Sequence, residues 1–266
     1  MTQNERLDIL VERFKEDSGE YRNLRVGNDP EEKRTVLRSL MNIRMPRRMD
    51  ADTLRIQDEY LQEAARERGV VPLADIPVLE GVLSLWQGDI TQLAVDAIVN
   101  AANSQMLGCF VPMHICIDNC IHTYAGIQLR AECARQMAAL REKYGPDYEQ
   151  PTAVPMLTDA YNLPAKKVVH IVGPIVEGRL TPALEKDLAD CYTNTLDLCA
   201  ANGLKNVAFC GISTGVFHFP PERAAQIAVK TVREWLAAHE GQMERVIFNV
   251  FSDRAKIIYK KELEQK

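Results

Sequence analysis

The sequence predicts a layered α/β domain with a mostly parallel or mixed central sheet over residues 79–266, preceded by a helical extension over residues 1–78. Two observations along the 266-residue chain support this prediction. Up to about residue 78 the chain is rich in Arg, Glu, Asp and Leu and has few β-branched residues. From Gly81 onward, short apolar runs alternate with amphipathic segments of helical length, which is typical of strands separated by helices.

The extension is expected to contain amphipathic helices. Its first apolar residues recur at the spacing of one helix face: Leu7, Leu10, Val11 and Phe14. Breaks are expected at the Gly-Asn-Asp-Pro stretch of residues 27–30 and at the Met-Pro pair of residues 45–46. Residues 71–77, which begin with Val-Pro and end with Ile-Pro, are interpreted as a connector.

The α/β domain is predicted from its alternating elements. The strand candidates are Leu83–Gln87, Ala97–Asn100, Val168–Val172, Val207–Cys210 and Val246–Val250. Helices are expected at about residues 118–144, 182–202 and 221–239, and Pro221 is well placed at the start of the last one. Ligands of such folds bind beyond the carboxyl ends of the strands, so functional residues are expected in the loops that follow them.

Composition narrows the classes of function. The formal net charge is −5 and the basic residues are scattered, so we expect no nucleic-acid partner. A small anionic ligand is compatible with this charge, because its binding depends on local backbone amides. The polar N-terminus has no signal-peptide core, and no apolar run reaches the roughly 18 residues of a membrane helix. We therefore expect a cytoplasmic protein that does not contact a membrane.

Polar residues follow the first two predicted strands. Asp89, when ionised, offers acceptor oxygens to an amine such as adenine N6. Taken alone, this aspartate is more typical of a turn or a helix N-cap. Asn100 and Asn103 flank two alanines, which let a backbone approach a ligand while an amide reaches a hydroxyl. Of the two, Asn103 is the better candidate for a ligand contact.

The loop after the strand at residues 207–210 is suited to binding a phosphate group. Its sequence is Gly211-Ile212-Ser213-Thr214-Gly215-Val216-Phe217. Small residues expose consecutive amide groups that can surround an anion, and the helix that follows adds the positive end of its dipole. Many strand-to-helix turns have similar sequences. This loop therefore supports a phosphate site only in combination with the loops that contain Asp89 and Asn103.

The most distinctive motif is a C-x4-H-x-C pattern formed by Cys109, His114 and Cys116. Thiolates and imidazole are preferred zinc ligands, and three of them leave a position open, as in many catalytic sites. A structural site usually has four protein ligands, and Cys120 or His122 could supply the fourth. The alternative is a set of packed thiols without a metal, since free cysteine is commonly a small buried hydrophobe.

The other cysteines and one histidine are interpreted as core residues. Cys133, Cys191 and Cys199 fall on apolar faces of predicted helices, and Cys210 ends a predicted strand. His170 lies inside a predicted buried strand, where a hydrogen-bonded core histidine is more common than a catalytic base.

In combination these motifs resemble a known family, the macrodomains. The stretches that resemble their ligand loops are Gly88–Thr91, Asp96–Ser104 and Gly211–Phe217. The segment Met106–Asn119 resembles the insert of the microbial zinc-dependent macrodomains, which are protein-ADP-ribose hydrolases, and the helical extension is also similar to that subfamily. The resemblance spans about residues 82–260. It implies a three-layer α/β/α macrodomain with a mixed central sheet at residues 79–266.

The resemblance also implies a role for each loop. Asp89 and the Ile90 amide would hold adenine, the loop from Ser213 to Phe217 would surround the diphosphate, and Asn103 would contact the distal ribose. The implied ADP-ribose contacts are Asp89, Ile90, Asn103, Cys116, Ile117, Asp118, Ser213, Thr214, Gly215, Val216 and Phe217. The implied ligands of one zinc ion (Zn2+) per chain are Cys109, His114 and Cys116, and the implied catalytic residues are Asp118 and Asn103.

The implied reaction is hydrolysis of the bond between C1 of the distal ribose and a protein side chain. In this interpretation zinc polarises the site, the diphosphate loop supplies binding energy, and Asp118 acts as a base or orients water. Two rivals stay open: a reader module with structural zinc, and a deacetylase of O-acetyl-ADP-ribose. The family also resembles partners of sirtuin-class ADP-ribosyltransferases, which suggests a modified lipoyl-carrier protein as substrate. The sequence leaves open the modified side chain, the role of the N-terminal helices and the oligomeric state.

Overall fold

The N-terminal segment folds into a bundle of helices. They are α1 (Gln3–Ser18), α2 (Pro30–Ile43) and α3 (Ala51–Arg68). Side chains at their starts accept hydrogen bonds from the first turn, with Thr2 in a capping box, Asp29 before the proline that opens α2, and Asp50 before α3. The breaks expected at residues 27–30 and 45–46 separate the helices as predicted, with Pro30 itself opening α2.

Apolar side chains of the three helices form a cluster of their own. Its buried members are Leu7, Leu10, Val11, Phe14, Leu37, Leu40, Met41, Ile56, Tyr60, Leu61 and Ile127. All but Ile127 come from the bundle, so Ile127 of α5 extends this apolar cluster into the rest of the molecule. The boundary near residue 78 stays a prediction. On its N-terminal side, β1 (Val71–Pro72) pairs with β3 (Leu93–Ala94), and Ile76 is buried in the larger cluster.

The computed structural model describes residues 1–265, and its centre is a six-stranded mixed sheet in the order β2-β8-β7-β4-β6-β5. The strands are β2 (Leu83–Gln87), β4 (Ala97–Ala102), β5 (Met156–Asp159), β6 (Lys167–Val172), β7 (Asn206–Phe209) and β8 (Arg245–Val250). Neighbouring strands are parallel except for β5, which is antiparallel to β6. The predicted layered α/β fold with a mixed sheet is therefore confirmed.

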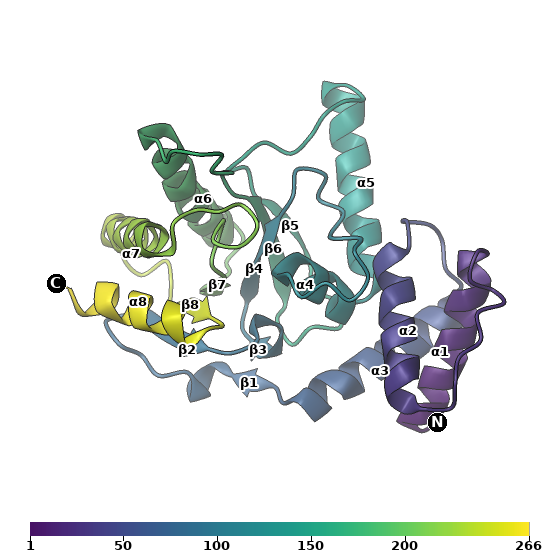
Figure 1. Ribbon diagram of the computed structural model, residues 1–266. Coiled ribbons are helices and arrows are strands. Elements are labelled where there is room, and N and C mark those ends of the chain that lie inside the picture. Colours follow the sequence, from purple (N-terminus) through teal and green to yellow (C-terminus); the bar gives the residue numbers. More distant parts are fainter. Residues whose placement is uncertain (266) are drawn as a thin grey trace.

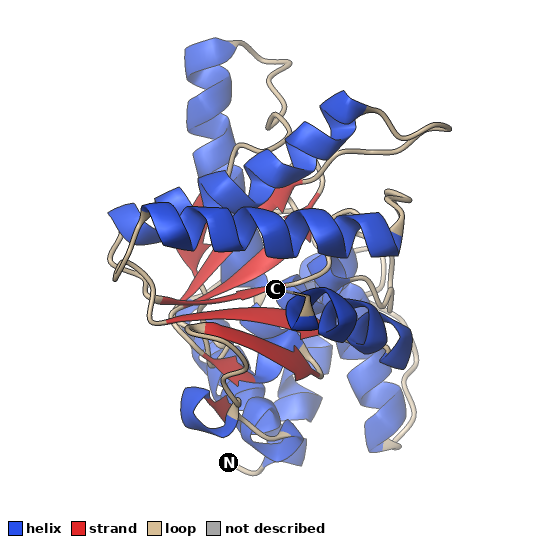
Figure 2. Ribbon diagram, turned by 90° about the vertical axis from the view of Figure 1, so that its left-hand side faces the viewer, coloured by secondary structure: helices blue, strands red, loops and turns tan. Residues whose placement is uncertain are grey.

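Helices cover both faces of this sheet (Figures 1 and 2). They are α4 (Ile117–Ala125), α5 (Ile127–Tyr144), α6 (Pro182–Ala201), α7 (Pro221–Ala238) and α8 (Asp253–Glu264). In Figure 1, α4 and α5 lie on the side of the N-terminal bundle, and α6 and α7 lie on the opposite side. None of the helices described within residues 1–265 is both long and apolar enough to span a bilayer.

The single helix expected at residues 118–144 is wrong, because the chain forms two helices there. Gly126 separates α4 from α5 with a φ of +94°, a left-handed conformation that ends one helix and lets the next begin in a new direction. The break matters for function, because it sets the direction of the short helix that follows the C-x4-H-x-C segment.

Candidate functional site

The loops singled out from the sequence lie at one edge of the sheet. Because β2, β8, β7, β4 and β6 are parallel, their carboxyl ends face the same way. Asp89 therefore follows β2 at the same edge at which Asn103 follows β4 and Ser213 follows β7. Gly173, directly after β6, packs against the last of these loops, since a Cβ atom built on it would lie 2.1 Å from Ser213 Oγ.

Asp89 acts locally as a cap. Its Oδ1 accepts hydrogen bonds from the Thr91 amide (2.9 Å) and hydroxyl (2.7 Å), at the start of the short 3₁₀ helix Ile90–Gln92. Its Oδ2 accepts from Arg68 Nη1 at 3.1 Å. The side chain is 33% exposed, so the carboxylate can still accept a bond from a ligand. The cap and the predicted ligand contact are thus compatible.

The loop from Gly211 to Phe217 contains an unusual serine. Ser213 has a φ of +61° and is 4% exposed. Its Oγ is buried and has no hydrogen-bond partner within residues 1–265. Buried polar atoms of native proteins are nearly always paired, so this hydroxyl is available to a polar group of a ligand at the loop. Val216, in contrast, is 67% exposed at the tip of the loop.

The two asparagines after β4 have different surroundings. Asn103 holds its own loop, since its Oδ1 accepts from the Gln105 amide (3.1 Å) and its Nδ2 donates to the Gly108 carbonyl (3.4 Å). Asn100 is fully buried, and its Nδ2 donates to Asp118 Oδ1 at 2.8 Å. Asp118 is thereby held from the sheet, although it lies in the first turn of α4.

Asp118 is buried, with 5% of its surface exposed. Burial raises the pKa of its carboxyl to about 6, although the hydrogen bond from Asn100 and the charge of Arg130 act in the opposite direction. A carboxyl of this kind exchanges protons near neutral pH, which suits a residue that accepts or directs a proton.

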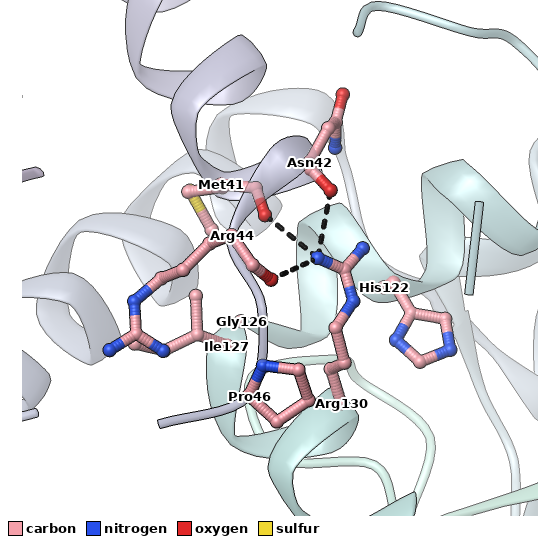
Figure 3. Close-up of a pocket in the computed structure, with 8 residues that line it drawn as sticks. All are labelled: Met41, Asn42, Arg44, Pro46, His122, Gly126, Ile127 and Arg130. Atoms are coloured by element: carbon pink, nitrogen blue, oxygen red, sulfur yellow. Dashed lines mark hydrogen bonds between the residues drawn. The ribbon is translucent and has the colours of Figure 1, made fainter. Parts of the chain in front are cut away.

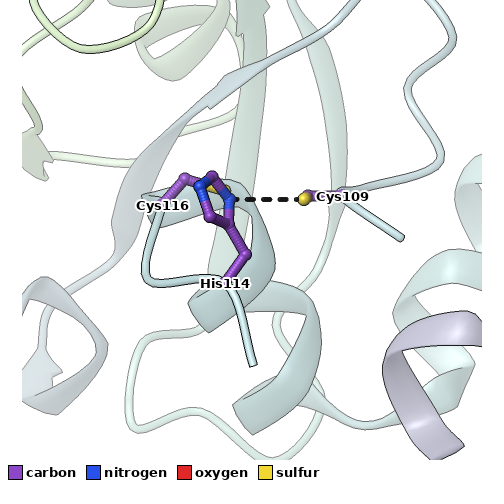
Figure 4. A group of neighbouring side chains, drawn as sticks. All are labelled: Cys109, His114 and Cys116. Atoms are coloured by element: carbon purple, nitrogen blue, oxygen red, sulfur yellow. Dashed lines mark hydrogen bonds between the residues drawn. The ribbon is translucent and has the colours of Figure 1, made fainter. Parts of the chain in front are cut away.

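Cys109, His114 and Cys116 converge, as the C-x4-H-x-C pattern predicts (Figure 4). Their ligand atoms all lie within 4.8 Å of one another, and Cys109 Sγ is 3.5 Å from His114 Nδ1. Cys116 caps α4, with its Sγ accepting from the Asn119 amide at 3.4 Å. Burial raises the pKa of the Cys116 thiol, and a cation bound between the donors would favour its thiolate form. Two sulfurs and an imidazole in this arrangement fit a metal ion.

A second group of possible donors, His122, Cys133 and His170, lies in the core. Asn100 Nδ2 and Thr158 Oγ1 are 3.1 and 3.0 Å from the two ring nitrogens of His170, so this histidine is hydrogen-bonded as predicted. The grouping was not predicted, because its members come from α4, α5 and β6. Either of the two groups could hold a metal ion.

Comparisons with known proteins agree with this geometry. The family described as "Macro domain" matches residues 99–228. A protein-ADP-ribose hydrolase of Treponema medium is 49% identical over 265 residues, which are 98% of this chain and 99% of the relative. A protein-ADP-ribose hydrolase of Staphylococcus aureus strain MRSA252 is 38% identical over 96% of this chain and 94% of its own length.

Solved structures are similar as well. A Trypanosoma brucei macrodomain in complex with ADP-ribose superposes with a TM-score of 0.63 and 27% identity, over 88% of this chain and 95% of that one. An Oceanobacillus iheyensis macrodomain with ADP gives a TM-score of 0.59 and 35% identity, over 68% of this chain and 90% of that one.

Proposed function

The chain belongs to the macrodomain family of protein-ADP-ribose hydrolases, and from this premise we propose that it hydrolyses mono-ADP-ribose from modified protein side chains with the help of one zinc ion. The observation that carries most of the proposal is the convergence of Cys109, His114 and Cys116 directly before the helix that bears Asp118. Nearly full-length relatives with that activity support the hydrolase assignment.

The arrangement of the loops supports ADP-ribose as the ligand. From Asp89 after β2 to Asn103 after β4 there are three inter-strand steps, or roughly 14 Å at about 4.8 Å each. An extended ligand can therefore place its adenine at Asp89 and the Ile90 amide and its distal ribose at Asn103. The loop from Ser213 to Phe217 lies between them, after β7. Its diphosphate contacts would come from Ser213, Thr214, Gly215, Val216 and Phe217.

In the proposed reaction, water adds across the bond between C1 of the distal ribose and the protein side chain. The water oxygen bonds to C1, and the released side chain takes up a proton. Asp118 accepts or orients the proton of the attacking water, and Asn100 holds that carboxyl in place through its 2.8 Å hydrogen bond. Asn103, Ile117 and Cys116 line the ribose end, so the reacting carbon is fixed by contacts on several sides.

Zinc fits the donor set, and Cys109, His114 and Cys116 would be its protein ligands. A zinc ion held there would supply Lewis-acid polarisation beside the distal ribose. The diphosphate loop contributes binding energy remote from the chemistry, and this energy can be used to orient the ribose.

The decisive experiment follows free ADP-ribose against time with the purified full chain and a mono-ADP-ribosylated protein. We expect turnover that stops when a zinc chelator is added and returns with zinc. Cys116→Ala should release ADP-ribose at least about 100-fold more slowly, as expected when catalysis depends on an ordered metal site. Cys199→Ala is the matched control, because Cys199 is a buried cysteine on α6 that lies outside the C-x4-H-x-C motif.

Undiminished release by Cys116→Ala would contradict the zinc mechanism. Tight binding of ADP-ribose without turnover would indicate a reader module instead. We propose a lipoyl-carrier protein modified by a sirtuin-class transferase as the first substrate to try, on the basis of the sequence resemblance. O-acetyl-ADP-ribose belongs in the same panel, since a deacetylase would use the same pocket.

A further inference from the structure

Helix α2 of the N-terminal bundle packs against α4, next to the segment that carries Cys109, His114 and Cys116 (Figure 1). This segment has no helix or strand of its own between Ala102 and Ile117. Few local hydrogen bonds fix its backbone, one of which joins the His114 amide to the Val111 carbonyl. Apart from these bonds and those of the Asn103 side chain within its loop, contacts from outside the segment hold its shape.

Arg38 of α2 supplies the first of these contacts. Its Nη2 donates to the His114 carbonyl at 2.8 Å and to Asn119 Oδ1 at 3.0 Å. Asn119 in turn donates through Nδ2 to the carbonyls of Cys109 (3.3 Å) and Val111 (2.9 Å). Arg38 thus holds the backbone of one donor directly and that of a second donor through a single side chain.

Asn42 lies one turn further along the same face of α2 and is 1% exposed. Its Oδ1 accepts from the Met113 amide at 3.0 Å, and its Nδ2 donates to Thr123 Oγ1 at 2.9 Å. Met113 has a φ of +59°, an uncommon conformation for a residue other than glycine. The hydrogen bond between the Met113 amide and Asn42 stabilises this turn. The turn positions His114, which is the next residue.

Arg130 of α5 fastens the end of α2 to the domain (Figure 3). Its Nη1 donates to the carbonyls of Met41 (3.1 Å), Asn42 (2.8 Å) and Arg44 (2.7 Å), where a positive charge complements the helix dipole. Its Nε donates to the Leu107 carbonyl at 2.7 Å, just before the metal-ligand segment. The same buried guanidinium therefore fixes α2 and the start of that segment relative to each other.

We propose that α2 is a positioning element of the metal centre, with Arg38 and Asn42 as positioning residues that bring the three donors together. The inference rests on the zinc site of the proposed function, but not on hydrolysis. Groups that orient metal ligands from outside typically change metal affinity 10- to 100-fold when removed, because the ligands must then be ordered at the cost of binding energy. The bundle is, on this account, part of the active site.

The test measures zinc affinity of the full chain by competition with a chromogenic chelator, without substrate. Arg38→Ala and Asn42→Ala should each bind zinc about 10- to 100-fold more weakly than the wild type. Arg34→Ala is the matched control, since Arg34 lies one turn earlier on α2 in an exposed ion pair with Glu31, and it should stay within about twofold. Cobalt(II) in place of zinc should give visible spectra that differ between the two positioning variants and the wild type.

Thermal unfolding of the metal-free variants separates positioning from loss of fold. If Arg38→Ala unfolds, Arg38→Lys, which keeps a donor, replaces it and should recover part of the affinity. Zinc affinity within twofold of wild type in both variants would overturn the inference, and so would a wild type that binds no zinc. A wild type that binds zinc but releases no ADP-ribose would end the proposed function and leave the inference standing. An active wild type whose variants bind zinc equally well would end the inference alone.

Discussion

At the residue scale, the pair formed by Asn100 and Asp118 joins the sheet to the proposed chemistry. Asp118 stands at the start of a helix, but its orientation is set by an amide on the neighbouring strand β4. The carboxyl is buried, so its position is far less variable than that of an exposed aspartate. A residue fixed in this way can act on one particular atom of a bound ligand.

Asp118→Asn should lower kcat for ADP-ribose release by about 10²- to 10⁴-fold, the usual contribution of a positioned acid or base. The side-chain shape is kept, and an amide oxygen can still accept the bond from Asn100. The affinity for ADP-ribose should therefore change much less than kcat. Single-turnover kinetics and calorimetric titration with ADP-ribose measure the two quantities. A kcat within threefold of wild type would show that Asp118 does not take part in proton transfer.

Replacing Ser213 should have opposite effects on the stability of the protein and on its affinity for ADP-ribose. Its hydroxyl has no partner among residues 1–265, and it should destabilise the free protein, since a buried donor without a partner costs about 1–3 kcal/mol. Ser213→Ala removes that cost, so the melting temperature should stay unchanged or rise. ADP-ribose should bind about 10- to 100-fold more weakly, because a hydrogen bond to a charged group contributes about 1.5–3 kcal/mol. A variant that is less stable but binds normally would mean that the hydroxyl has a partner inside the protein.

At the element scale, the break between α4 and α5 depends on Gly126. A Cβ atom there would lie 2.8 Å from Gln128 Oε1, 2.8 Å from Gln57 Nε2 and 3.0 Å from Asn162 Nδ2. These side chains connect α3, α5 and the loop after β5 around the break. The position thus requires both a left-handed backbone and the absence of a side chain.

Gly126→Ala should therefore destabilise the protein more than Gly145→Ala does. Gly145 also has a positive φ, +114°, but a Cβ atom there would meet no atom of the described chain within 4 Å. Each variant carries a backbone strain of about 1–3 kcal/mol, and Gly126→Ala must in addition displace three side chains. Urea denaturation of both proteins gives the comparison. Equal losses of unfolding free energy would show that the side chains around position 126 are displaced without an energetic cost.

The sequence predicts secondary-structure elements and the loops between them better than it predicts the tertiary contacts among these elements. Apolar runs identify the strands, and the rule that ligand loops follow strands locates Asp89, Asn103 and Ser213. The edge strand β5 is not among the predicted strands, since its Met-Leu-Thr-Asp run is short and its antiparallel pairing with β6 depends on distant residues. The sequence does not predict the contacts of Arg38 either, because Arg38 and His114 are 76 positions apart in the chain.

On the scale of the whole molecule, the bundle is held together by polar as well as apolar contacts. Asp17 at the end of α1 accepts hydrogen bonds from Arg44 Nε (2.9 Å) and Arg47 Nε (3.1 Å), which follow α2. Arg44 is 5% exposed, so this is a largely buried ion pair at the end of the helix that contacts the metal-ligand segment. Its loss should loosen α2 from α1.

Stability of the whole protein should consequently depend on pH through Asp17. Burial alone would raise the pKa of this carboxyl, but the hydrogen bonds from Arg47 and Arg44 outweigh it and hold the pKa below its ordinary value of 3.8. A carboxyl whose pKa is lowered by folding stabilises the native state above its ordinary pKa, and the stabilisation is lost as pH falls through the lower folded value.

We therefore expect Asp17→Asn to reduce the unfolding free energy by about 1–3 kcal/mol at pH 7, because it removes the charge that compensates a buried arginine. The difference from wild type should shrink as the pH is lowered from 4 toward the folded pKa. Denaturant titrations at a series of pH values measure it. Asp190→Asn is the control: its partner Lys186 lies on the exposed surface of α6, and such pairs contribute only about 0–1 kcal/mol. A difference that stays constant through the acidic range would mean that Asp17 contributes by its shape rather than by its charge.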